Sequence, residues 1–221
     1  MSTATTPRPP ASDPSGTGGS TGAGDDVVQL HRRTIDKVLI GFGALCTVVF
    51  LVAGGLLAWG ADFSADYVHD ELASQNVFFP EAAELREEGR DDLVGHAGDQ
   101  VTTGGEAQAY ASYIGGHLEG IANGKTYSEI DDRGAAAAVE AATESGASDA
   151  EIAELQATAD QLKAQRDTLF KGETLRGLLL TSYAWSTVGR IAGYAAIAAF
   201  LAAVAMGALT VAGLVHLRRQ A

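Results

Sequence analysis

The chain has 221 residues and a formal net charge of −13, from 28 Asp and Glu against 15 Lys and Arg. This acidic balance argues against a nucleic-acid-binding protein, because such proteins need basic grooves. The single cysteine, Cys46, cannot form an intrachain disulfide, so any domain must be held by packing alone.

Residues 1–34 are predicted to form a disordered cytoplasmic tail. Most of residues 1–24 are Ser, Thr, Gly, Pro and Ala, with almost no large apolar side chain. A segment of this composition buries too little surface to offset the entropy lost on ordering.

Two long apolar runs dominate the chain, Val38–Ala61 with 24 uncharged residues and Ile191–Val215 with 25. At about 1.5 Å per residue, each helix can cross a hydrocarbon core of about 30 Å. The sequence therefore predicts an all-α protein with transmembrane helices over residues 35–61 and 188–217. A buried core helix is the alternative for each run, and a cleaved signal peptide is disfavoured by the length of the first.

The basic residues predict the orientation of these spans. Arg32, Arg33 and Lys37 precede the first run, and Arg218 and Arg219 follow the second. Residues 62–187 carry 24 Asp and Glu against 8 Lys and Arg, a formal charge of −16. The positive-inside rule then places the chain in the cell membrane with residues 1–34 and 218–221 cytoplasmic and residues 62–187 extracytoplasmic. The predicted anchors at the outer interface are Trp59, Trp185 and Arg190.

Small residues recur every four positions in the second span, at Ala195, Ala199, Ala203 and Gly207, with a shorter counterpart at Gly54 and Ala58. Such a ridge allows another helix to approach closely. We expect the two spans to pack on each other. A partner's helix, or no packing role in a chain rich in Ala and Gly, remains as an alternative.

Between the spans, the pattern predicts an acidic helical domain. The first helix is expected to continue to about Asn76, followed by a short helix over Glu81–Glu88 behind Pro80 and an irregular connection over Asp91–Gly105. Thr103 with Glu106 forms a capping-box pair for the next helix. Its predicted apolar stripe is Tyr110, Tyr113, Ile114, His117, Leu118 and Ile121, and its predicted stop is Asn123-Gly124.

Two further capping-box pairs follow. Thr126 with Glu129 predicts a helix that ends at Glu144-Ser145-Gly146, and Ser148 with Glu151 predicts a third helix. The third carries heptad positions Ile152, Leu155, Ala159, Leu162 and Leu169, a seam that Arg166 interrupts.

The last predicted helix is Thr174–Leu217, about 65 Å long and so about twice the hydrocarbon thickness. Its first half must stand outside the membrane, where we expect it to pack on the extended first helix as a stalk. Whether the outer domain is a compact bundle or an open hairpin stays undecided at this level.

No catalytic or metal-ligating pattern accompanies these elements. In His69-Asp70-Glu71 and His117-Leu118-Glu119 the candidate ligands point to different faces of a helix, and His96 lies in a Gly-rich stretch. Residues 62–187 contain no Gly-x-Ser-x-Gly motif. The prediction is a protein that is not an enzyme, with no catalytic, metal or cofactor-binding residues and no cofactor. A metal-dependent enzyme based on His96 and His117 is the weakest alternative.

Several segments resemble a family of uncharacterised actinobacterial membrane proteins: Val77-Phe78-Phe79-Pro80, the stretch from Ala109-Tyr110 to Thr126-Tyr127, Gly172-Glu173-Thr174-Leu175-Arg176-Gly177-Leu178-Leu179 and Val188-Gly189-Arg190-Ile191-Ala192-Gly193. The resemblance covers roughly residues 35–217 and implies a two-span layout in an actinobacterial envelope. Some members carry a ring-opening dioxygenase label, for which this sequence offers no iron-ligand arrangement.

The functional hypothesis is a non-catalytic accessory membrane protein whose outer domain binds or stabilises another membrane or envelope protein. The expected partners are that protein and the lipid bilayer, with self-association left open and nucleic acid excluded. The alternative is an extracytoplasmic sensor that relays a shift through its spans to a partner.

Overall fold

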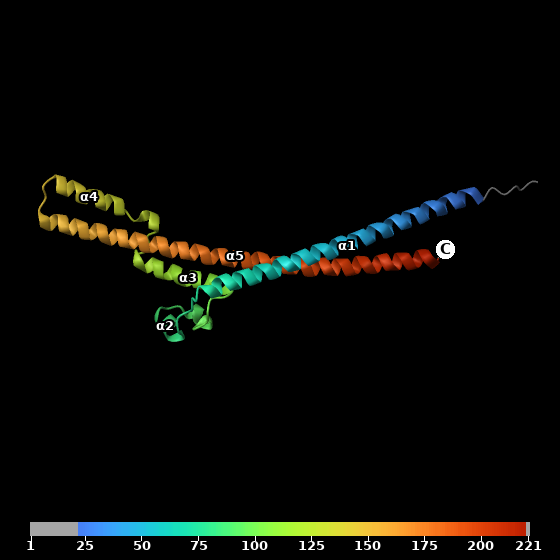
Figure 1. Cartoon of the computed structure of the whole chain (residues 1–221), viewed down its shortest axis with the longest axis horizontal. Coiled ribbons are helices and arrows are strands. Elements are labelled where there is room, and N and C mark those ends of the chain that lie inside the picture. Colours follow the sequence, from blue (N-terminus) through green and yellow to red (C-terminus); the bar gives the residue numbers. More distant parts are fainter. Residues whose placement is uncertain (1–21, 220–221) are drawn as a thin grey trace, which may run out of the picture. The chain divides into compact units, whose positions relative to one another are not determined.

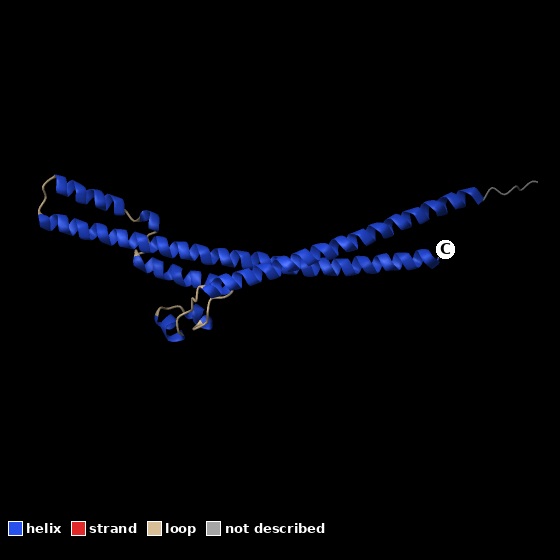
Figure 2. Ribbon diagram, in the orientation of Figure 1, coloured by secondary structure: helices blue, strands red, loops and turns tan. Residues whose placement is uncertain are grey.

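The computed structural model describes residues 22–219, and every element in this part of the chain is a helix (Figures 1 and 2). The predicted all-α class is therefore confirmed. The elements are α1 (Gly22–Ser74), α2 (Ala82–Glu87), the 3-10 helix η1 (Asp91–His96), α3 (Gly104–Ile121), the 3-10 helix η2 (Tyr127–Glu129), α4 (Asp132–Glu144) and α5 (Asp149–Arg219).

The chain divides into two compact units, and both α1 and α5 pass through each of them. Unit 1 comprises residues 1–49 and 202–221, and unit 2 comprises residues 50–201. Unit 2 contains all of the shorter helices.

Helix α1 starts earlier than the sequence predicts. The part of the predicted disordered tail from Gly22 to residue 34 is helical, while residues 1–21 lie outside the described residues. A helix nucleated by the apolar run can propagate backward here because the sequence has no proline between residues 15 and 79. The helix ends close to the predicted position, where Asn76 takes a left-handed φ of 50°.

Helix α5 is a single element of 71 residues, so the prediction of two separate helices with a break before Thr174 is wrong. Gly172, whose helix propensity is poor, lies just before Thr174. Tertiary packing overrides this propensity, because a Cβ at Gly172 would overlap the side chain of Leu118 on α3. The glycine is therefore a contact point for α3 rather than a helix stop.

The main core of unit 2 forms where α1, α3 and α5 meet. Val68 and Leu72 from α1 and Leu179 from α5 are buried together with Ala107 and Ala111 of α3. Helix α1 thus packs on the first half of α5, as expected for these segments. The cluster is completed by Phe79 and Val101.

The segment that follows α1 contributes the remaining residues of this core. Backbone N–H groups of Phe79 and Val101 donate to the carbonyls of Asp99 and Val77, at 2.9 Å each. Gly98 with φ 74° and Gly89 with φ 70° supply the left-handed turns that return the chain. The predicted short helix is confirmed as α2, but the connection predicted as irregular contains η1, whose Leu93 is buried.

Helix α3 begins at the predicted capping box. The Glu106 N–H donates to Thr103 Oγ1, and the Glu106 carboxylate accepts from the N–H groups of Thr102 and Thr103 at 2.8 and 2.9 Å. The predicted apolar stripe is confirmed in part: Leu118 is buried and Tyr110 and Ile114 pack against the core, whereas His117 is exposed. Ala107 and Ala111, which the prediction missed, are buried as well. Small alanines face the core because they allow α3 to approach α1 and α5 closely.

The capping box at Glu106 predicts that the stability of the fold decreases at acidic pH. Partial burial raises the pKa of Glu106, but hydrogen bonds from Thr102 and Thr103 outweigh it, and the net pKa is lowered. A carboxyl whose pKa is lower in the folded state stabilises the fold above the unfolded pKa of about 4.3, and this contribution is lost as pH falls through the folded pKa.

We expect Glu106→Gln to cost about 0.5–1 kcal/mol at pH 7 and to reduce the difference in stability between pH 7 and pH 3. Thermal unfolding of the full chain in detergent at both pH values measures this. Glu140→Gln on the exposed face of α4 is the control, and an equal loss of pH dependence in both variants would contradict the assignment.

A second core lies under the end of α3. Leu118, Ala122, Ile130 and Leu169 are buried together. The Thr126–Glu129 capping box opens η2 rather than α4, so that prediction is corrected: α4 begins at Asp132, after a new N-cap. Ile130 has an extended backbone and its side chain is buried in this core, so a new helix begins only after it.

Helix α4 lies along the first part of α5 (Figure 1) and is fixed there by one ion pair. Arg166 Nη1 contacts Asp132 Oδ1 at 3.1 Å, and its guanidinium lies 5.1 Å from the centre of the Tyr127 ring. The polar residue that interrupts the predicted heptad seam is therefore an intramolecular contact.

Candidate functional site

In unit 1, α1 and α5 meet along a seam of small and polar residues. An added Cβ at Gly43 would lie 2.6 Å from Thr210 Oγ1, one at Gly207 would lie 3.5 Å from Thr47 Cγ2, and one at Gly213 would lie 3.0 Å from Ile40 Cγ1. Residue numbers rise on α1 as they fall on α5, so the two helices are antiparallel. Close approach here depends on the absence of side chains at these glycines.

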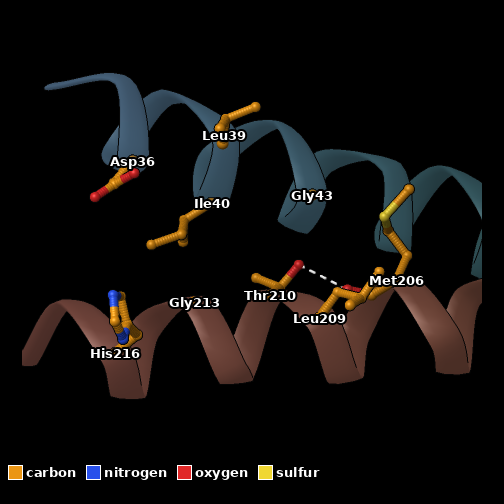
Figure 3. Close-up of a pocket in the computed structure, with 9 residues that line it drawn as sticks. All are labelled: Asp36, Leu39, Ile40, Gly43, Met206, Leu209, Thr210, Gly213 and His216. Carbon is orange, nitrogen blue, oxygen red and sulfur yellow. Dashed lines mark hydrogen bonds between the residues drawn. The ribbon is translucent and has the colours of Figure 1, made fainter. Parts of the chain in front are cut away.

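The seam opens into a cleft of about 250 Å³ near its end. Figure 3 shows Asp36 of α1 and His216 of α5 on opposite walls, with Ile40 and Gly213 between them. The Thr210 hydroxyl donates to the carbonyl of Met206 at 2.8 Å, within its own helix. The cleft is thus mainly apolar, with one acid and one histidine at its mouth.

The same two helices form a second stretch of seam within unit 2. A Cβ at Gly54 would lie 3.0 Å from the ring of Phe200, and one at Gly189 would lie 2.8 Å from Ser64. Ser64 is buried, and its Oγ donates to the backbone carbonyl of Trp185 at 2.8 Å. A hydroxyl buried between helices is satisfied by this bond, which joins α1 directly to α5.

Among the predicted helix-packing residues, Gly54 and Ala203 are buried. Ala58, Ala195, Ala199 and Gly207 are half-buried. The buried alanines of this part of α5 are Ala196 and Ala203, which are seven residues apart, so the seam follows a heptad rather than the four-residue ridge. A search of the sequence for small residues at seven-residue spacing would have found Ala196, which the four-residue pattern missed.

The outward faces of both helices carry the large apolar residues. Between residues 35 and 63 of α1 the exposed ones are Ile35, Val38, Leu39, Phe42, Leu45, Val48, Val49, Leu51, Val52, Leu56, Trp59 and Phe63. Between residues 188 and 215 of α5 they are Val188, Ile191, Tyr194, Ile197, Phe200, Leu201, Val204, Leu209, Val211, Leu214 and Val215. Both helices are long and apolar enough to cross a membrane, and only 11% of each apolar stretch is buried.

The three predicted interfacial anchors are all exposed. Trp59 stacks on Phe63 with ring centres 5.7 Å apart, and Trp185 has 54% of its surface exposed. Arg190 donates to Thr187 Oγ1 at 3.2 Å, one turn earlier on α5. Their location at a membrane interface remains a prediction.

An apolar groove of about 350 Å³ lies between the last part of α1, from Tyr67 to Gln75, and residues 175–185 of α5. Helix α5 contributes Leu175, Leu178 and Trp185, and the α1 wall includes Tyr67 and Glu71. Leu178 is 63% exposed, which is unusual for a leucine beside a formed core. The groove was not predicted, because its two walls are more than 100 residues apart in sequence.

A cavity of about 370 Å³ lies between the segment after α2 and the second half of α3, and a cluster of polar side chains lines it. His117 Nε2 lies 3.3 Å from Glu88 Oε1, and His117 Nδ1 lies 3.3 Å from the carbonyl of Tyr113. Burial raises the pKa of Tyr113 to about 12, and the charge of Glu88 and a hydrogen bond with it act in the same direction. Tyr113 therefore stays protonated and can act as a hydrogen-bond donor.

Arg90 completes this cluster but is already bonded. Its Nε and Nη2 donate to Asp92 at 2.9 Å, which lowers the pKa of that carboxyl, and its Nη1 donates to the carbonyl of Ser112 at 3.0 Å. Arg90 thus ties the start of η1 to α3. A Cβ added at Gly116 would lie 3.4 Å from Arg90 Nη1, an ordinary contact.

The three histidines considered as metal ligands do not form one site. The His96 ring stacks on Phe79 with centres 5.1 Å apart, and His117 pairs with Glu88. His69 is exposed on α1. Among the described side chains, which cover residues 33–219, no group of three histidine, cysteine or carboxylate side chains lies close enough to hold a metal ion.

Comparisons of the chain with protein-family models, with curated proteins and with solved structures find no match. The resemblance to a two-span actinobacterial family therefore rests on the sequence segments alone.

Proposed function

We propose that the chain is an integral membrane protein that crosses the bilayer twice, with both termini cytoplasmic and residues 62–187 outside the cytoplasm. The support is the distribution of side chains on α1 and α5. Glycines such as Gly43, Gly54 and Gly213 lie at the contacts between the two helices, whereas most of the large Val, Leu, Ile, Phe and Trp side chains of both apolar stretches are exposed. In water this arrangement would expose a large apolar surface. In a bilayer, lipid solvates that surface, and close packing of small residues stabilises the association of the two helices.

Thiol labelling tests the topology, since Cys46 is the single native cysteine. In a Cys46→Ala background, Ser145→Cys between α4 and α5 is expected to react with a membrane-impermeant maleimide on intact cells. Arg219→Cys at the end of α5 is expected to react only after permeabilisation. The reverse pattern would overturn the proposed orientation.

We further propose that the outer domain is a non-catalytic accessory module that binds or stabilises another membrane or envelope protein. The observation that carries this proposal is the uncovered apolar wall of α5 in unit 2, at Leu175, Leu178 and Trp185. Exposed contiguous apolar surface of this kind marks interaction sites in folded proteins. The resemblance to the actinobacterial two-span family is consistent with such an envelope role.

The test is purification of the full chain from its native membrane in mild detergent, after brief chemical crosslinking. The expected result is a stoichiometric complex with a second protein. A monodisperse monomer, with and without crosslinking, would contradict the accessory role.

A second candidate is an extracytoplasmic sensor, and the polar cluster formed by Glu88, Tyr113 and His117 supports it. A protonated tyrosine and a histidine around a cavity of about 370 Å³ could bind a small polar ligand. A thermal-shift screen with small envelope metabolites and ions tests this candidate. A ligand that shifts the wild type but not Tyr113→Phe would favour it, and no shift with any compound would count against it.

A further inference from the structure

The imidazole of His117 on α3 lies between two oxygen atoms. Its Nε2 lies 3.3 Å from Oε1 of Glu88, the residue that ends α2, and its Nδ1 lies 3.3 Å from the carbonyl oxygen of Tyr113. Both oxygens can only accept a hydrogen bond when Glu88 is ionised. The His117 side chain is 49% exposed and that of Glu88 is 30% exposed, so solvent protons reach the pair.

These two contacts coexist without repulsion in only one protonation state of the ring. The contact with the Tyr113 carbonyl places a proton on Nδ1, because a carbonyl oxygen cannot donate. In the neutral ring Nε2 then carries a lone pair, which the Glu88 carboxylate repels. In the doubly protonated ring the Nε2–H group is positive, and the same contact becomes an ion pair. The geometry therefore fits the imidazolium form.

The acidic side chains of α2 favour this charged form. Burial raises the pKa of Tyr113, and the negative charges of Glu88 and Glu84 raise it further. Both carboxylates thus act on the face of α3 that carries Tyr113 and, one turn later, His117. Because Tyr113 stays protonated, it adds no charge of its own to this face near neutral pH.

The basic side chains Arg90 and Arg176 are already paired. Arg90 lines the same cavity as the imidazole, but its Nε and Nη2 donate to Asp92 at 2.9 Å each. On α5, Arg176 Nε would lie 3.5 Å from a Cβ added at Gly115, and Arg176 pairs with Glu173 at 3.3 Å. A carboxylate beside each guanidinium offsets its positive charge, so the carboxylates of α2 act on the imidazole with little opposition.

The turn that carries Glu88 joins α2 to η1, and it is linked to α3 twice. The N–H of Arg90 donates to the carbonyl of Leu85 at 2.7 Å, and Leu85 is fully buried. Arg90 Nη1 donates to the carbonyl of Ser112 on α3 at 3.0 Å, a bond that holds at any pH near neutral because arginine stays charged. The contact between Glu88 and His117 is the second link, and this one depends on a proton.

We propose that protonation of His117 fastens the turn after α2 to α3, so that the segment of α2 and η1 (residues 82–96) is held more firmly at acidic than at alkaline pH. Because the fold favours the protonated ring, this stabilisation is present at the acidic end of the range of about pH 5–8 in which histidine changes charge, and it is lost as pH rises through that range. The proposal deepens the sensor candidate and rests on the proposed location of residues 62–187, since it names the external proton as the signal.

Hydrogen exchange of the full chain in mild detergent at pH 5.5 and pH 8 tests this proposal. Gly89, Arg90 and Leu93 are the reporters, because their N–H groups donate to carbonyls within the segment. Exchange times are scaled to the intrinsic exchange rate at each pH, so the remaining difference lies in the opening equilibrium. We expect about twofold to fivefold greater protection at pH 5.5, as for a partly exposed ion pair. Glu106, whose pKa is lowered, stays charged at both pH values.

Matched variants assign the effect to the pair. His117→Gln and Glu88→Gln are each expected to remove the difference in protection between the two pH values. Glu87→Gln at the neighbouring exposed carboxylate, and His69→Gln at an exposed histidine of α1, should both keep it. A difference that persists in His117→Gln, as it would if His96 in η1 were the responsive group, would overturn the proposal.

The protonation state of the ring is a second measurement, and it requires no variant of the pair to be stable. The chain has five histidines, and ring ¹⁵N and ¹³C signals of a histidine-labelled sample are assigned to His117 by their absence in His117→Gln. We expect both ring nitrogens to be protonated at pH 5.5 and Nδ1 alone at pH 8. A neutral ring with its proton on Nε2 at pH 8 would overturn the proposal, because it could donate to Glu88 without being charged.

Failure of this proposal and failure of the proposed function are distinguishable. The exchange and ring measurements report the link between α2 and α3 in detergent, whatever the topology of the chain. Thiol labelling tests the location of residues 62–187 separately. A pH-independent segment in a chain with the expected labelling pattern would refute the proton-dependent link and leave the membrane topology intact.

Discussion

Replacing Phe79 with alanine is expected to lower the free energy of unfolding of unit 2 by about 3–5 kcal/mol. Phe79 is 3% exposed and lies in the main core with Val101 and Leu179. Its ring stacks on His96 at 5.1 Å and meets the edge of Tyr110 at 5.2 Å. Truncation would remove these ring contacts and leave a cavity at the junction of α1, α3 and the segment around η1.

The neighbouring residue provides a matched control. Phe78 has the same side chain but is 53% exposed, so Phe78→Ala should cost less than about 1 kcal/mol. Hydrogen exchange of the α3 amides in the full chain, in detergent, reports the opening free energy of unit 2 without requiring reversible unfolding of the membrane segments. Similar loss of protection in both variants would show that Phe79 is not the anchor of this core.

Replacing Gly104 with alanine is expected to destabilise the junction of α3 and α5 by about 1–3 kcal/mol. Gly104 is buried at the first position of α3, where an added Cβ would overlap the Cβ of Ser186 and lie 3.2 Å from the Cα of Tyr183. One of these neighbours is backbone and the other is a Cβ, so neither can rotate away. Helix α3 would have to shift outward as a whole.

Gly105 is the control, because it is the next residue in the same turn. An added Cβ there would meet Thr103 Oγ1 at 3.9 Å, an ordinary contact. Gly105→Ala should therefore be neutral, or stabilising by up to about 1 kcal/mol through its better helix propensity. Thermal unfolding of both variants in the full chain measures the difference, and a Gly104→Ala protein as stable as Gly105→Ala would refute the close contact.

The capping boxes and turns of the outer domain could be predicted from the sequence because they are local. Thr103 and Glu106 are only three residues apart in the chain. Asn123 and Gly124 end α3 with φ of 52° and 78°, which requires no distant contact. The two apolar stretches could also be predicted from the sequence, because length and composition are properties of a single segment. Their insertion in a membrane remains a proposal, supported by the outward placement of the large side chains.

The candidate site could be predicted only in part. Trp59, Trp185 and Gly54 were singled out from position and size, and the structure places Trp185 on the wall of a groove that no local pattern revealed. The groove is formed by residues of α1 and α5 that are more than 100 residues apart in the chain, such as Tyr67 and Leu178.

The sequence by itself determined the helical class, the C-terminal end of α1, the positions of α2 and α3, and the length of the apolar segments, because each follows from interactions within a few residues. Tertiary structure alone decided that α5 continues through Gly172, that Ala196 is buried, and that Ala107 and Ala111 are buried on α3. In each of these cases, the space available beside a neighbouring helix outweighs intrinsic propensity. That space is set by residues far away in the chain.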